Sequence, residues 1–430
     1  MTALELTSAD VGVAPAASEA AWPFAKRFGF AFVVALLFIM NWPFPLGYVP
    51  GTDAVGDWLA KPWEVMVPYV ATHVFHVPAD VRPNGSGDTT YNYVQQALMT
   101  AMALVAALIW AAWDRKASRY ERVHRAFRVY LRFALASAMI LYGTVKIIPS
   151  QFPPPTLDRL VEPFGAASPM GLLWTFMGAS HAYNVLTGSV ELLGGILLAT
   201  RRTTLLGALV SAGAMANVVV LNFCYEVPVK LYSMQLFLQA VVIAAPDFIR
   251  LPKALLREEQ GLFRKRWAVR ASAAAGVLLV GFWVVFGFQR AYGAATTSGY
   301  LSPRSPLRGV WSVDELTDNG VARPPLTTDV DRWRRVIFDS PRFGFIQYMS
   351  DARLRYRMEL DEKAHSIKLT DWENEKRITT LAYVRPDPRT LVLDTTLDGH
   401  KLHAVCHLSD ASSLLTTRGF HWINEYPFNR

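Results

Sequence analysis

Residues 183–200, YNVLTGSVELLGGILLAT, decide the fold of this chain. The stretch is mostly apolar and approaches the roughly 20 residues that a membrane span needs. It also carries the carboxylate Glu191 near its middle. Because an ionisable group at such depth is costly, it normally faces a bundle interior and has a partner there. The stretch therefore predicts a membrane helix bundle that holds a polar site.

Apolar stretches of similar length recur along the chain. They predict about seven transmembrane helices in all, the others being 28–43, 92–113, 128–147, 204–222, 229–246 and 268–288. The chain is 52% hydrophobic and only 18% charged, whereas a soluble domain is about a quarter charged. This composition excludes a disordered or fibrous chain.

Lysine and arginine gather on one side of the expected membrane. They precede the first span, cluster between 115 and 128, and cluster again between 250 and 270. By the positive-inside rule, the N-terminus is cytoplasmic and the C-terminal part is extracytoplasmic. The net charge of +8 follows from this rule. Since acids and bases nearly balance within 290–430, we expect no nucleic-acid partner.

The polypeptide changes its hydrophobic period after residue 290. Residues 353–360 alternate strictly, and KRITTLAYV, TLVLDTT and HKLHAVCHL follow, with Asp398-Gly399 as a hairpin turn between the last two. Several short strands at this spacing predict a small all-β barrel or sandwich.

The expected organisation has five parts: a disordered cytoplasmic tail at 1–25, N-terminal helices at 26–125 with an outer loop at 44–91, a four-helix membrane unit at 126–250, a basic cytoplasmic loop and last span at 251–290, and an extracytoplasmic barrel-like domain at 291–430.

Local signals mark further elements on the outer side. Residues 52–77 predict a helix whose Trp58, Trp63 and Tyr69 suit a membrane interface. Ser168-Pro169 predicts the start of another helix. Asp88 or Thr89 is expected to cap the second span.

Lys146, near the outer end of 128–147, is the natural partner for Glu191. Polar residues on two later spans extend a seam, namely Asn217, Asn222, Gln235 and Gln239. One interpretation is a proton or ligand site. The other is an ion pair that locks helix packing, while Gly188, Gly194 and Gly195 permit close approach.

Residues 126–250 resemble the DoxX-like family of bacterial membrane proteins. The resemblance lies in Tyr142-Gly143 with Lys146, in Glu191 followed by Gly194-Gly195, and in Pro246-Asp247. It implies a four-helix inner-membrane unit associated with quinone- or thiol-linked oxidoreductase complexes. On that hypothesis Glu191 relays a proton and Lys146 holds an anionic or carbonyl group of a quinone or lipid-like molecule. Tyr142, His181 and Asn217 are then candidate ligand-binding residues.

The outer turn 222–230, NFCYEVPVK, places Cys224, Glu226 and Lys230 close in sequence. A lysine can lower the pKa of a nearby thiol and make it reactive, so Cys224 is a candidate redox residue; the alternative is an inert thiol. A disulfide with Cys406 is permitted by compartment. However, Cys406 alternates with apolar neighbours and is expected to be buried in the β-domain.

Histidines do not form a metal motif. His73 and His76 lack a third ligand at a defined spacing. His403 and His407 lie roughly 13 Å apart along a strand, too far to bind one ion together. We therefore expect no metal site.

The β-domain resembles lipocalin-like barrels in two features, the motif Gly309-Val-Trp311 near its start and Arg418 near its end. The resemblance implies that Trp311 packs against Arg418 and that the barrel encloses one apolar ligand. The alternative is a filled barrel. The aromatic tail 420–430 is expected to dock onto the barrel mouth or the outer loops.

Three functions remain open at this stage. The first is a redox-linked component that binds a quinone or lipid-like molecule near Glu191 and Lys146. The second is a non-catalytic protein that transfers a lipid or small molecule, which a cavity in the β-domain would favour. The third is an assembly subunit with partners in an envelope complex, which a filled barrel would favour.

Overall fold

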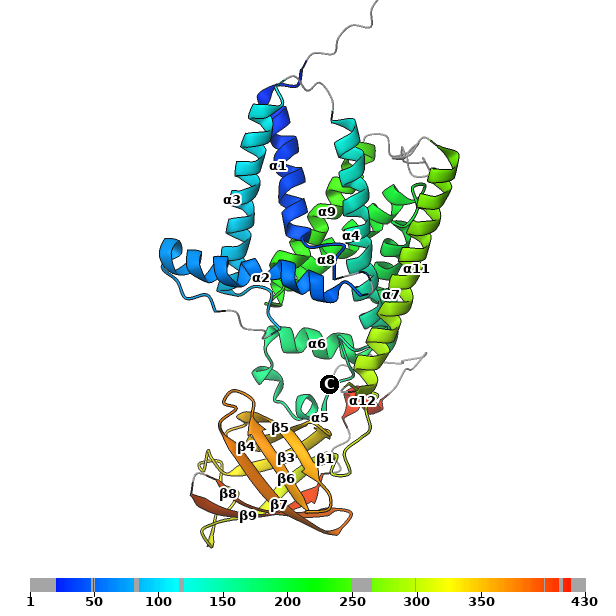
Figure 1. Ribbon diagram of the computed structural model, residues 1–430. Coiled ribbons are helices and arrows are strands. Elements are labelled where there is room, and N and C mark those ends of the chain that lie inside the picture. The colour runs from blue at the N-terminus through cyan, green and yellow to red at the C-terminus, as the bar shows by residue number, and fades with distance from the viewer. Residues whose placement is uncertain are drawn as a thin grey trace, which may run out of the picture. The chain divides into compact units, whose positions relative to one another are not determined.

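The computed structural model describes residues 21–47, 49, 51–80, 85–115, 120–248, 265–297, 299–397, 399–409 and 413–418 (Figure 1). The chain divides into two compact units, the first ending at Ala134 and the second beginning at Leu135. The predicted tail at 1–25 lies almost wholly outside the described residues. The aromatic tail at 420–430 and most of the basic loop after 248 lie outside them as well.

The first unit is built on three helices. They are α1 (Phe24–Asn41), α2 (Asp53–Val70), which continues as a π-helix (Ala71–Phe75), and α3 (Thr90–Trp113). The α1 and α3 helices pack against each other, and α2 packs on α3. The Thr89 side chain accepts a hydrogen bond from the backbone N–H of Asn92, which confirms it as the N-cap of α3.

The helix α4 (Glu121–Ile147) joins the two units. The second unit continues with α5 (Leu157–Leu160), a 3₁₀ turn (Phe164–Ala166), α6 (Pro169–Ala179), α7 (His181–Leu197), α8 (Thr204–Cys224), α9 (Lys230–Phe248) and α11 (Arg266–Thr297). As predicted, the Ser168 hydroxyl accepts a bond from the backbone N–H of Gly171 and Pro169 opens the helix.

Six helices of the described residues are long and apolar enough to cross a membrane: α1, α3, α4, α8, α9 and α11. They are consistent with a multi-pass membrane protein. The remaining predicted span, 183–200, corresponds to α7, which has 17 residues and carries Glu191. The expected count of about seven therefore stays a prediction.

The C-terminal domain is a closed antiparallel barrel. Its strands are β1 (Gly309–Asp318), β2 (Val321–Ala322), β3 (Trp333–Ser340), β4 (Phe343–Tyr348), β5 (Arg353–Asp361), β6 (Ser366–Asp371), β7 (Ile378–Asp387), β8 (Thr390–Leu397) and β9 (His400–Leu408). Each strand from β3 onward pairs with the next, and the β1–β9 pairing closes the circle. The short β2 pairs only with the end of β1. The alternating sequence pattern predicts a small barrel or a sandwich, and the structure shows the barrel.

The inward positions of the strands form one apolar core. Tyr356 and Met358 of β5 are buried, as the alternation of 353–360 predicted. Trp311, Phe338 and Cys406 are fully buried in the same core. The β8–β9 hairpin pairs Leu397 with His400 around Gly399, whose φ is +86°. The centre of the barrel is therefore filled with side chains.

Candidate functional site

Two glycines bring α4 and α7 into backbone contact. A Cβ atom on Gly188 would lie 2.6 Å from the carbonyl oxygen of Gly143, and one on Gly143 would lie 2.7 Å from the carbonyl oxygen of Gly188. No real side chain fits at such distances. Because Lys146 and Glu191 each follow one of these glycines by three residues, they share its helix face and meet at the crossing.

The Lys146 ammonium donates a hydrogen bond to Glu191 Oε1, so the two form an ion pair. Both side chains are more than nine-tenths buried. Glu191 Oε2 is buried too and has no hydrogen-bond partner among the described residues. The predicted ion pair between Lys146 and Glu191 is present. Removing one partner would destabilise the protein strongly, because the other charge would stay buried without a partner.

The other residues predicted near this pair lie in different surroundings. His181, the first residue of α7, and Asn217 of α8 are exposed. Tyr142 is half-buried, with its ring 6.1 Å from that of Tyr232. Asn222 is buried and donates to the Ser233 hydroxyl at 3.0 Å, which links α8 to α9. The polar groups of α8 and α9 therefore include at least one bond between helices.

The candidate redox residue Cys224 ends α8 and leads into the turn that follows. Cys224 and Glu226 are exposed, and Glu226 has a left-handed φ of 54°. Lys230 Nζ donates to the Val227 carbonyl at 3.3 Å. Cys224 and Cys406 are both free thiols, which rules out the disulfide alternative. Burial raises the pKa of the Cys406 thiol to about 12, in agreement with the expected buried position.

Five histidines are in contact with other protein groups. His73 Nδ1 lies 2.8 Å from the Tyr69 carbonyl oxygen, and His76 Nδ1 lies 3.2 Å from that of Thr72. Those of β9 pair with aspartates: His400 with Asp318, His403 with Asp394 and His407 with Asp314. No group of three metal-ligating side chains occurs in the part of the chain that the structure describes.

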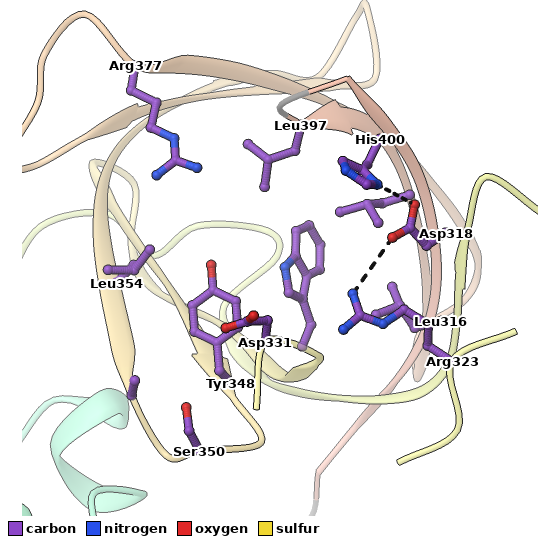
Figure 2. A pocket seen from close by; sticks show the side chains of 13 residues that line it. Leu316, Asp318, Arg323, Asp331, Tyr348, Ser350, Leu354, Arg377, Leu397 and His400 are labelled. Carbon is purple, nitrogen blue, oxygen red and sulfur yellow. Dashed lines mark hydrogen bonds and ion pairs between the residues drawn. The ribbon is translucent and has the colours of Figure 1, made fainter. Parts of the chain in front are cut away.

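A pocket of about 560 Å³ opens at one end of the barrel (Figure 2). Its apolar wall consists of Trp333, Ala352 and four leucines, namely Leu316, Leu354, Leu397 and Leu402. Its polar lining comprises Asp318, Arg323, Asp331, Tyr348, Ser350, Arg377 and His400. The pocket is thus a mouth above a filled barrel, with an apolar wall and charges of both signs.

One side of the mouth is a chain of polar contacts. His400 Nδ1 lies 2.9 Å from Asp318, and Asp318 lies 3.8 Å from Arg323. Arg323 also pairs with Asp329, whose pKa is lowered chiefly by the hydrogen bond from this guanidinium. Figure 2 places Arg377 across the opening from His400 and Asp318. Burial raises the pKa of Tyr348 between these sides, so its hydroxyl stays protonated at neutral pH.

Arg332 anchors the loop that leads to the mouth. Only 1% of this residue is exposed, and its guanidinium donates to four backbone carbonyls, those of Arg323, Trp333, Val313 and Asp314. These bonds tie the loop to β1 and the start of β3. The sequence gives no signal for Arg332 or for the mouth, because residues 319–332 show no periodic pattern.

Trp311 lies inside the barrel and donates its indole N–H to the Leu307 carbonyl at 2.8 Å. The Arg385 guanidinium of β7 lies over its ring, 5.6 Å from the ring centroid. Arg418, which the lipocalin-like resemblance places against Trp311, follows α12 (Leu414–Thr417), and its packing against Trp311 stays a prediction.

A second feature without a signal in the sequence is the ionic contact between β5 and the segment around α5. Arg353 donates to the Asp158 carbonyl at 2.8 Å and to a carboxylate oxygen of Glu162. Glu162 also accepts from Arg159 at 2.7 Å. The side chains of Asp158 and Glu162 are at least nine-tenths buried, so the contact is shielded from water.

The fold defines a protein with several long apolar helices followed by a closed β-barrel. The chain is 30% identical, over 153 residues, to the uncharacterized protein YwoB of Bacillus subtilis (strain 168); the match covers 35% of this chain and 88% of that protein. The chain belongs to the family of that protein. No protein-family model matches the chain, and no solved structure matches it.

Proposed function

We propose that the protein is a membrane-anchored binding protein whose barrel mouth takes up a small amphipathic molecule. The pocket at the mouth is the observation that carries the proposal. Its volume of about 560 Å³ falls within the range of roughly 300–1,000 Å³ that is typical of small-molecule sites. Among the functions considered, this one corresponds to non-catalytic transfer of a lipid or small molecule, which a cavity in the β-domain favours. The mouth pocket is that cavity, although the barrel core beneath it is filled.

The lining of the pocket supports an amphipathic molecule. Trp333 and the leucines offer an apolar surface, whereas the opposite charges of Arg377 and Asp331 lie near the opening. Because the barrel core below is filled, the molecule lies in the mouth and does not thread through the barrel. An apolar part on the wall and a polar group at the opening fit this arrangement.

The test uses the full chain in nanodiscs and the probe 11-(dansylamino)undecanoic acid. Blue-shifted dansyl emission, excited through tryptophan and corrected for empty nanodiscs, reports binding. Leu397→Asp puts a charge on the apolar wall and is expected to weaken binding at least about tenfold. Thr396→Asp, on the exposed face of the same strand, is the matched control and should bind like the parent. Equal binding by both variants would contradict the proposal.

A second candidate function, redox work with a quinone near Lys146 and Glu191, draws on a different observation. The buried Glu191 Oε2 has no hydrogen-bond partner among the described residues, which suits an acid that exchanges a proton. Glu191→Gln should then change the quinone content and the oxidised-minus-reduced spectrum of the purified protein. An unchanged content and spectrum would remove this candidate.

A further inference from the structure

The helix α2 carries two apolar stripes. One is buried: Gly56, Trp63 and Val67 lie along it, and it continues to Ala71 in the π-helix. Trp63, Val67 and Ala71 form a core with Val94 of α3. Trp63 therefore belongs to the protein interior, although the sequence grouped it with Trp58 and Tyr69 at an interface.

The second stripe is exposed. Val55, Trp58, Val65 and Tyr69 recur at helical spacing, and between 47% and 73% of each residue is exposed. A third stripe, also exposed, is polar and contains Asp57, Lys61 and Glu64. The helix thus presents one face to the protein, one polar face, and one aromatic and apolar face that no described residue covers.

The neighbours of α2 place it at one end of two candidate spans. Its core includes Ile39 near the end of α1 and Val94 near the start of α3, and Figure 1 shows α2 running across these two helices. Both α1 and α3 are long and apolar enough to cross a membrane, with only 17% of each apolar window buried. The exposed stripe of α2 therefore lies at the level where the exposed apolar surfaces of α1 and α3 end.

We propose that α2 is an in-plane interfacial helix whose exposed stripe inserts into the lipid leaflet at that end of α1 and α3. Trp and Tyr are the residues enriched at this depth of a bilayer, because their rings are apolar and their tips are polar. A helix with separate apolar and polar faces lies in the plane of the interface. The partner is thus a lipid surface, and the polar stripe of α2 faces water.

The experiment measures the collision of nitroxide labels with oxygen, which concentrates in lipid, and with a water-soluble nickel chelate. The full chain in nanodiscs carries Cys224→Ser, so that the buried Cys406 is the remaining native thiol. Labels are placed on Val65→Cys and Tyr69→Cys of the exposed stripe and on Lys61→Cys and Glu64→Cys of the polar stripe. Ile109→Cys, on an exposed position of α3, is the lipid reference.

Insertion predicts that the oxygen-to-nickel ratio at 65 and 69 is about threefold or more higher than at 61 and 64. The ratio at 65 and 69 should also be lower than the ratio at the lipid reference 109. Equal ratios on the two stripes, whether both are low as in water or both are high as in lipid, would overturn the proposal. Exclusion of both reagents at 65 and 69 would mean that a second copy or a partner protein covers the stripe, which also overturns it. A label on Val55→Cys repeats the test on the same stripe if the Tyr69 variant does not fold.

Discussion

Gly143 of α4 and Gly188 of α7 touch through their backbones: a Cβ atom on Gly188 would lie 2.6 Å from the Gly143 carbonyl oxygen. The contact sets the separation of the two helices at the level where Lys146 and Glu191 meet. Close approach through small residues is a main way in which membrane helices associate.

Gly188→Ala is expected to destabilise the helical part by about 1–3 kcal/mol, because the added methyl group forces α4 and α7 apart. Thermal unfolding in one detergent measures the loss. Gly213→Ala on α8 is the control, since a Cβ there meets nothing within 4 Å. The explanation by backbone contact fails if the two variants unfold alike.

Breaking the buried ion pair is predicted to cost more than removing it. Glu191→Leu leaves the Lys146 ammonium buried without its partner and should cost about 3–5 kcal/mol. The double variant Glu191→Leu with Lys146→Met leaves no buried charge at this pair and should recover most of that loss. The same unfolding assay compares them. A double variant less stable than the single one would show that the charges do not act as a pair.

Arg332→Met is predicted to loosen the mouth of the barrel. The substitution removes a guanidinium that donates to four carbonyls, and leaving buried acceptors without donors costs about 2–5 kcal/mol in total. Hydrogen exchange at the start of β3 should rise accordingly. Arg334→Met removes a more exposed arginine that pairs with Asp351 and should cost less than about 1 kcal/mol. Equal exchange in the two variants would contradict the anchoring role.

The contact of Arg353 with Glu162 and Asp158 predicts that charge reversal frees the α5 segment. Arg353→Glu places three carboxylates together and should increase proteolytic cleavage near 157–162. Adding Glu162→Arg to that variant restores an opposite pair and should reduce the cleavage again. If the double variant is cut as fast as the single one, the ionic contact does not hold this segment.

Cys406 predicts a pH effect on barrel stability. The folded thiol has its pKa raised to about 12 from 9.0 by burial, so above pH 9 the unfolded chain loses a proton that the folded barrel keeps. Stability therefore falls as pH rises, by at most about 1.4 kcal/mol per pH unit from this group. Urea unfolding of the parent should show a steeper decline between pH 9 and 10.5 than unfolding of Cys406→Ala. Identical slopes would contradict the assignment.

Local patterns predicted the parts of the fold that depend on local chemistry. The alternation of 353–360 predicted which residues of β5 face inward, and Thr89 and Ser168 cap their helices as expected. Lys146 and Glu191 were paired from sequence because a charge in an apolar helix needs a partner. Each of these inferences used a few neighbouring residues and one physical rule.

The features that depend on distant contacts could not be predicted. Arg353 and Glu162 are 191 residues apart in the chain, and no local pattern around either residue indicates the other as its partner. The mouth pocket gathers residues from six strands and from the loops between strands, so its composition follows only from barrel closure. Trp58 and Trp63 look alike in sequence, yet their different positions around α2 leave one exposed and bury the other.

The central claim is that the barrel mouth holds a small molecule. Its most direct test is native mass spectrometry of the full chain released from nanodiscs, where the measured mass is compared with that of the polypeptide. The account predicts one added mass at near-unit stoichiometry, lost in Leu397→Asp and kept in Thr396→Asp. A parent protein with the mass of the polypeptide alone, or an added mass that persists in Leu397→Asp, would contradict it.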